Sequence, residues 1–137
     1  MSLSSAYARI SLLTILFLTL HFTDDVLRKS SGMDQRGFSG LFVVLILVAW
    51  LYGILRLEGR RAGYIIGLLA SFMASFIALG HLTGVGGDVF VSEIAEASGA
   101  LFVWVVFVLG VTGILSLIFS ALLLFSPATG RSGAKPS

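Results

Sequence analysis

The sequence has little charge. Only 12% of its 137 residues are Asp, Glu, Lys or Arg, whereas 57% are hydrophobic. Soluble domains carry about 25% charged and roughly 45–50% apolar residues. Too few polar side chains are present to cover a folded core in water, and a chain this apolar does not stay disordered. A soluble domain and a disordered chain are therefore excluded, and the composition predicts an integral membrane protein.

The sequence also contains no cysteine. This absence excludes disulfides, thiolate metal sites and thiol nucleophiles, and it leaves the redox compartment undecided. The formal net charge is only +2, which is too small to indicate binding to nucleic acid.

Charged residues divide the chain into four apolar segments, each close to the roughly 20 residues that a membrane-spanning helix needs. The four predicted spans are about 6–23, 37–55, 62–80 and 99–126. No small-residue cleavage site follows the first span, so we expect a retained helix rather than a signal peptide. Trp50 and Tyr52, near the end of the second span, are expected at the membrane interface, where amphipathic rings concentrate.

Four spans joined by short links predict an all-α fold. We expect one domain over 1–137, an integral membrane four-helix bundle with antiparallel, up-down topology. Pro127 ends the last span, and 127–137 form a polar C-terminal tail. No repeat period stands out, so no internal duplication is expected.

Basic residues in short loops favour the cytoplasmic side of a membrane. With the N-terminus inside, the inner side carries six basic residues and one acid, a net +5. The outer side then carries three basic residues and six acids, a net −3. Arg56, Arg60 and Arg61, between the second and third spans, are the main basic anchors. The sequence thus predicts both termini on the cytoplasmic side of the membrane.

Small residues let membrane helices pack closely, because lipid tails are as apolar as leucine. Two small-residue stripes are predicted to face other helices: Gly63, Gly67, Ser71, Ala74 and Ala78 in the third span, and Gly110, Gly113, Ser116 and Ser120 in the fourth. The second span is bulky on all sides and is expected to face lipid or a larger partner. In the first span, the hydroxyls of Ser11, Thr14 and Thr19 are expected to bond their own helix backbone.

No Asp, Glu, Lys, Arg or His lies near the middle of any predicted span. Ionisable residues inside a membrane are usually functional. Their absence argues against a proton relay, a voltage sensor, an ion-coupled transporter and a midplane substrate site.

Polar residues gather instead at the predicted outer ends of the first and third spans. With the N-terminus inside, both histidines lie at this one membrane face. An imidazole and a carboxylate one helical turn apart can bind a divalent cation such as zinc, or act as a base with its orienting acid. The candidate ligands are His21, Asp24, Asp25, His81 and Asp88. A haem held between the two imidazoles is the less favoured cofactor.

Simpler roles for these acids stay open. Asp24 with Arg28, and Asp25 with Lys29, have the i, i+4 spacing of ion pairs on one helix. Asp88 can cap a helix that leads into the fourth span. Neither role needs a ligand.

The segment Leu20–Arg28, followed by Trp50–Gly53 and Ala62–Tyr64, resembles a group of small uncharacterised bacterial four-helix membrane proteins. These proteins share a His-x-x-Asp-Asp motif at the end of the first span. The resemblance covers most of the chain, implies the same membrane fold, and marks the histidine and the two acids of the motif. It implies no reaction.

Three functions are compatible with these features. An accessory or structural subunit, packed against other membrane proteins or a second copy, is favoured by the charge-free interior and the bulky second span. The alternative is a membrane protein that binds a metal or small ligand at the outer His/Asp site, and a small enzyme using that site comes third. The expected partners are the lipid bilayer and membrane protein, not nucleic acid.

Overall fold

The computed structural model describes residues 2–29, 37–84 and 99–126. These residues form helices and no strand, which confirms the all-α prediction. The helices are α1 (Leu3–Lys29), α2 (Gly37–Arg56), α3 (Arg61–Thr83) and α5 (Ala100–Leu124). Each coincides with one predicted apolar segment, although α1 and α3 continue beyond the predicted ends of their spans.

Three of these helices are long and apolar enough to cross a membrane: α1 over Leu3–Asp24, and the whole of α3 and of α5. The apolar part of α2, Leu41–Arg56, is shorter. Large apolar side chains cover the outer surface, and Leu69 and Leu101 are 61% and 79% exposed. Soluble proteins rarely carry such extended exposed apolar surface, so these faces suit lipid better than water.

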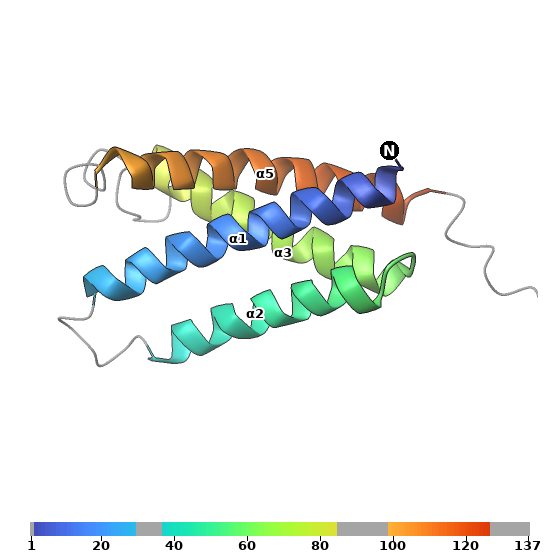
Figure 1. Cartoon of the computed structure of the whole chain (residues 1–137), viewed down its shortest axis with the longest axis horizontal. Coiled ribbons are helices and arrows are strands. Elements are labelled where there is room, and N and C mark those ends of the chain that lie inside the picture. Colours follow the sequence, from blue (N-terminus) through green and yellow to red (C-terminus); the bar gives the residue numbers. More distant parts are fainter. Residues whose placement is uncertain (1, 30–36, 85–98, 127–137) are drawn as a thin grey trace, which may run out of the picture.

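The core of the bundle is formed by α1, α3 and α5, and α2 packs chiefly against α3 at its side (Figure 1). The start of α1, the end of α5 and the α2–α3 turn lie at one end of the bundle. The end of α1, the start of α2, the end of α3 and the start of α5 lie at the other end (Figure 1). The chain therefore brings distant segments together at each end.

Glycine permits the tight connection between α2 and α3. Gly59, in the turn, has a φ of 75°, a left-handed conformation that L side chains rarely adopt. A Cβ on Gly63 would lie 2.6 Å from the Leu57 carbonyl oxygen and 2.8 Å from that of Gly53. The two helix backbones can approach this closely only because position 63 has no side chain.

The predicted small-residue stripes lie inside the bundle. Every residue of both is buried: Gly63, Gly67, Ser71, Ala74 and Ala78 in α3, and Gly110, Gly113, Ser116 and Ser120 in α5. A Cβ on Gly110 would lie 3.2 Å from the Cβ of Ala78. The stripes thus lie at contacts between helices: Ala78 of α3 faces α5, Gly67 faces α1 and α5, and Gly63 faces the end of α2.

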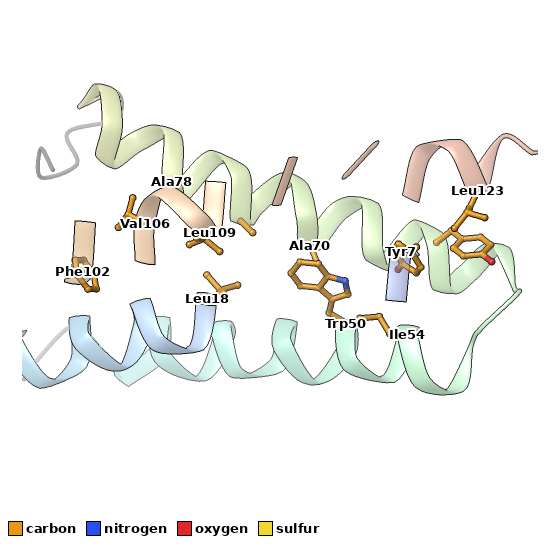
Figure 2. Close-up of a cluster of buried hydrophobic side chains, with 12 residues drawn as sticks. Tyr7, Leu18, Trp50, Ile54, Ala70, Ala78, Phe102, Val106, Leu109 and Leu123 are labelled. Carbon is orange, nitrogen blue, oxygen red and sulfur yellow. The ribbon is translucent and has the colours of Figure 1, made fainter. Parts of the chain in front are cut away.

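The interface prediction for Trp50 is wrong. Its side chain is 0% exposed, and Figure 2 shows it reaching from α2 toward Ala70 of α3, within the buried cluster that also contains Tyr7 of α1. Helix α2 buries few other side chains, so this large ring supplies much of the contact that holds α2 to the core. Its neighbour Tyr52 is 55% exposed.

Candidate functional site

Two layers of polar and aromatic side chains join α1, α3 and α5 inside the bundle. The first, the hydroxyl layer, consists of Tyr7, Ser11, Ser71, Ser116 and Ser120. The Ser116 Oγ lies 2.7 Å from the Oγ of Ser11 and 2.7 Å from that of Ser71. All three serines are 0% exposed. One hydroxyl of α5 therefore connects α1 with α3.

The proton directions in this layer follow from its acceptors. The Ser71 hydroxyl donates to the carbonyl oxygen of Gly67 at 2.6 Å, and a carbonyl can only accept. Ser116 must then donate to Ser71, and Ser11 must donate to Ser116. Each of these three hydroxyl protons has an acceptor inside the protein, so the arrangement is closed.

Tyr7 covers one end of the hydroxyl layer. Its ring packs edge to face on Tyr64 with centroids 5.5 Å apart, and its hydroxyl donates a long bond of 3.5 Å to the Gly63 carbonyl oxygen. The hydroxyl also lies directly against Gly67, where a Cβ would overlap it. Packing here depends on the absence of a side chain at Gly67.

The expectation for Ser11 is wrong, because its hydroxyl bonds Ser116 across the helix interface. For Thr14 and Thr19 the same expectation is confirmed. Their hydroxyls donate to the carbonyl oxygens of Ile10 and Ile15 at 2.9 and 2.7 Å.

The second layer, the histidine layer, consists of His21, His81 and Phe102. The two imidazoles meet edge to face, with ring centroids 4.9 Å apart and planes at 66°. Phe102 stacks on His21 at 5.3 Å with an interplanar angle of 25°. His21, His81 and Phe102 are 4%, 7% and 5% exposed. The chain contains only these two histidines, and the fold brings them together.

The helix directions explain this meeting. Along α1, residues 7, 11 and 21 lie beside 67, 71 and 81 of α3, so these two helices run the same way. The same residues of α1 lie beside α5 in the reverse order, at 116 and then 102. Because α1 extends to Lys29 and α3 to Thr83, both histidines lie within regular helix near the same end.

The predicted acids are placed less completely. Asp24, one turn beyond His21, is half-buried, and its Oδ2 is shielded from solvent. The Asp25 side chain and the whole of Asp88 lie outside the described residues, as do the side chains of Arg28 and Lys29. Within the described ranges, no group of three or more His, Asp or Glu could hold a metal ion. The described part of the chain thus assembles the two imidazoles but no complete set of protein ligands.

The spacing of the imidazoles matches coordination of one ion. Two imidazole nitrogens, each about 2.0–2.1 Å from a tetrahedral metal, place their ring centroids about 5 Å apart. The 4.9 Å between the two ring centroids is close to this value, and it is also an ordinary spacing for an edge-to-face ring contact. Axial ligation of a haem needs the two rings on opposite faces of a porphyrin, and rings in direct contact leave no room for that plane.

Besides Ser11, whose hydroxyl was assigned to its own helix, two contributors to these layers were not among the predicted site residues. Phe102 could have been suspected, because the fourth span starts at the end where both histidines lie. Tyr7 gave no such signal, since an aromatic residue near the start of a span is typical of an interface position. Its burial depends on the facing Gly67, which belongs to α3 and is distant in the sequence.

No protein-family model, no curated protein and no solved structure matches this chain. The resemblance to small bacterial proteins with the His-x-x-Asp-Asp motif therefore stays a prediction.

Proposed function

We propose that this chain is an integral membrane protein that binds a divalent transition-metal ion between His21 and His81. One observation carries the proposal: the two histidines of the chain, far apart in sequence, meet with ring centroids 4.9 Å apart while each is more than nine-tenths buried. Buried imidazoles in contact are a natural pair of nitrogen ligands, because neutral imidazole coordinates Zn²⁺, Cu²⁺, Ni²⁺ and Co²⁺.

The surroundings favour such an ion in two ways. Phe102 stacks on His21, which restricts the orientation of that ring before metal arrives. The half-buried carboxylate of Asp24 lies one helical turn away and supplies negative charge near a dication. With two protein nitrogens, the remaining coordination positions stay open to water or a small ligand. The affinities of divalent first-row metal ions for this nitrogen site should follow the Irving–Williams order, in which Cu²⁺ binds most tightly.

We also propose that all four helices cross the membrane in up-down order, with both termini on the cytoplasmic side of a bacterial cytoplasmic membrane. Helix α2 has 20 residues and is about 30 Å long, which matches the hydrocarbon thickness of about 30 Å. Arg56, Arg60 and Arg61 are exposed at the α2–α3 turn, at the end where the positive-inside rule puts them. The histidine layer then lies near the outer surface.

A chain without cysteine makes this topology easy to test. Thiols introduced by Ser2→Cys and by Val26→Cys lie just outside the apolar stretch Leu3–Asp24, at opposite ends of α1. Each can be challenged in intact cells with a membrane-impermeant maleimide. We expect labelling of the Val26→Cys variant alone. Labelling of the Ser2→Cys variant alone would reverse the orientation.

The metal proposal is tested by titrating the purified full chain, carried on a histidine-free affinity tag, with Cu²⁺ or Zn²⁺ in detergent. We expect one ion per chain, at least tenfold weaker binding for His21→Asn or His81→Asn, and loss of binding in the double variant. Thr23→Ala, an exposed change near the same end of α1, is the matched control and should bind as the parent does. Equal binding by the double variant and the parent would refute the proposal.

An accessory role beside other membrane proteins is a second candidate, and one observation favours it. The outer face of α2 is apolar and open, with Leu41, Leu45 and Val48 exposed by 57%, 57% and 59%. Cross-linking in native membranes should then join α2 to another chain. Chains that stay monomeric under the same treatment would exclude this role.

A further inference from the structure

The two halves of the chain repeat each other at one constant offset in the sequence, the offset that separates Ser11 from Ser71. About half of the residues from Leu41 to Leu55 in α2 are identical to the residues at the matching positions of α5. A few residues of α1 are likewise identical to their matching residues in α3. The identical pairs within the helices are Ser11/Ser71, His21/His81, Thr23/Thr83, Leu41/Leu101, Phe42/Phe102, Val43/Val103, Val48/Val108, Gly53/Gly113, Ile54/Ile114 and Leu55/Leu115. Aliphatic residues coincide easily in apolar helices, but glycine, serine and histidine do so less easily.

Burial repeats with the same offset. The buried positions of α1 are 7, 11, 14, 18 and 21, and the matching positions of α3, which are 67, 71, 74, 78 and 81, are all buried. Even a local hydrogen bond recurs, because Thr23 donates to the carbonyl oxygen of Thr19 and Thr83 donates to that of Leu79, each at 2.8 Å. The two helices therefore present the same face to the core.

Equivalent positions also meet in space. His21 contacts His81, Ser11 and Ser71 bond the same Ser116 hydroxyl, and the Tyr7 hydroxyl lies against Gly67. When two copies of one unit associate around a two-fold axis, a residue near the axis lies against the same residue of the other copy. In such an arrangement, each residue of α1 lies beside the residue of α3 that matches it in the sequence repeat, and this is the case here.

We infer that the chain is a tandem duplication of one two-helix unit, α1–α2 followed by α3–α5, and that the histidine site lies on the pseudo-two-fold axis between the copies. This replaces the expectation of no internal duplication. Each copy supplies one imidazole from the same position, so an ion on the axis is held by two equivalent ligands. The second helices have diverged in sequence and in packing: α5 packs against both α1 and α3, whereas α2 packs chiefly against α3 and little against α1. Where α5 has Ser116, α2 has Arg56, and Phe42, the counterpart of buried Phe102, is 52% exposed.

This inference rests on the histidine contact used in the proposed function, but it does not require a bound metal. Its first test is disulfide formation in the full chain, which contains no cysteine of its own. The in-register pairs, Ser11→Cys with Ser71→Cys and His21→Cys with His81→Cys, keep the repeat offset. The matched controls, Ser11→Cys with Ser75→Cys and His21→Cys with Ala78→Cys, shift one partner by about one helical turn.

We expect the in-register pairs to oxidise about tenfold faster than the shifted pairs at both levels, because only facing Cβ atoms fit disulfide geometry. Faster closure of either shifted pair would overturn the inference, since the spatial register would then differ from the offset of the sequence repeat.

The second test asks whether the two imidazoles are equivalent. Because Phe102 stacks on His21 while its counterpart Phe42 is 52% exposed, we expect His21→Asn and His81→Asn to weaken Cu²⁺ binding by factors that agree within about tenfold. Each variant should leave a complex with one coordinated imidazole nitrogen in electron paramagnetic resonance spectra. Factors differing by more than tenfold would contradict a site on the axis. Absence of Cu²⁺ binding in the parent would refute the proposed function alone, and the disulfide rates would still decide the duplication.

Discussion

The hydroxyl layer and the histidine layer are built by the same three helices, yet they contain different chemical groups. The layers are separated along α1 by the segment from Ser11 to His21, which is about 15 Å of helix. In the hydroxyl layer, the hydrogen bonds from Ser11 through Ser116 to Ser71 end on a backbone carbonyl. The histidine layer instead offers imidazole nitrogens, which coordinate metals readily.

Within one helix interface, the hydroxyl layer therefore contributes mainly to folding stability, and the histidine layer contains the groups proposed to bind a metal ion. Hydroxyls bonded to one another fix the register of α1, α3 and α5. Because each hydroxyl proton of this buried network already has an acceptor in the protein, the network is not suited to binding a ligand. Imidazoles in contact with each other also pack together, and their nitrogens are of the type that coordinates metal ions. We therefore expect changes in the hydroxyl layer to alter folding, and changes in the histidine layer to alter metal binding.

The largest effect on folding is expected at Gly67. In Gly67→Ala the new methyl group overlaps the Tyr7 hydroxyl, so we expect a loss of about 2–3 kcal/mol in the free energy of unfolding. Adding Tyr7→Phe removes the overlapping oxygen and should restore most of this loss. Detergent-induced unfolding measures both, with the exposed Leu69→Ala as control. A loss that Tyr7→Phe does not reduce would show that the clash is misplaced.

A smaller effect is expected from Ser116→Ala, which removes the hydroxyl that links Ser11 with Ser71. Hydrogen bonds between membrane helices contribute about 0.6 kcal/mol on average and up to about 1.7 kcal/mol. Losing two should lower the free energy of unfolding by about 1–2 kcal/mol and leave Cu²⁺ affinity unchanged. Thr19→Ala, whose hydroxyl bonds only its own helix, is the control. Weaker Cu²⁺ binding by Ser116→Ala would mean that the two layers are not independent.

In the histidine layer, Phe102→Leu removes the ring that stacks on His21. Aromatic pairs contribute about 0.5–1.5 kcal/mol beyond their buried area, so we expect Cu²⁺ binding to weaken by about three- to tenfold as the imidazole loses its fixed orientation. Calorimetric titration measures this change. Phe107→Leu, an exposed change on the same helix, should bind Cu²⁺ as tightly as the parent does. If Phe102→Leu binds Cu²⁺ as tightly as Phe107→Leu does, Phe102 does not contribute to the site.

The smallest effect is expected from Asp24→Asn. Its carboxylate acts on a bound dication through its charge, so the change should weaken Cu²⁺ binding by about threefold at low salt and less at high salt. A loss of a hundredfold or more would instead identify Asp24 as a direct ligand.

Much of the fold could be predicted from the sequence, because length and hydropathy locate helices well. The small-residue stripes could also be found, since close packing needs small side chains at helical spacing. Periodicity does not reveal which helix a face meets. For that reason the hydroxyl of Ser11 was expected to bond its own backbone, and Trp50 was expected at the interface rather than against α3.

The site could be predicted only in part. The charge distribution indicated one membrane face for both histidines, but their contact depends on the in-register packing of α1 and α3. The contribution of Phe102 depends on which helix faces meet, and substitutions among aliphatic residues obscure the inferred repeat in the sequence.

X-ray absorption at the zinc edge of the zinc-loaded full chain tests the central claim most directly. The account predicts two imidazole nitrogens per zinc at about 2.0–2.1 Å, with the outer-shell scattering typical of histidine rings, and loss of that scattering in the His21→Asn, His81→Asn double variant. A zinc environment made only of oxygen, or one unchanged by the double substitution, would contradict it.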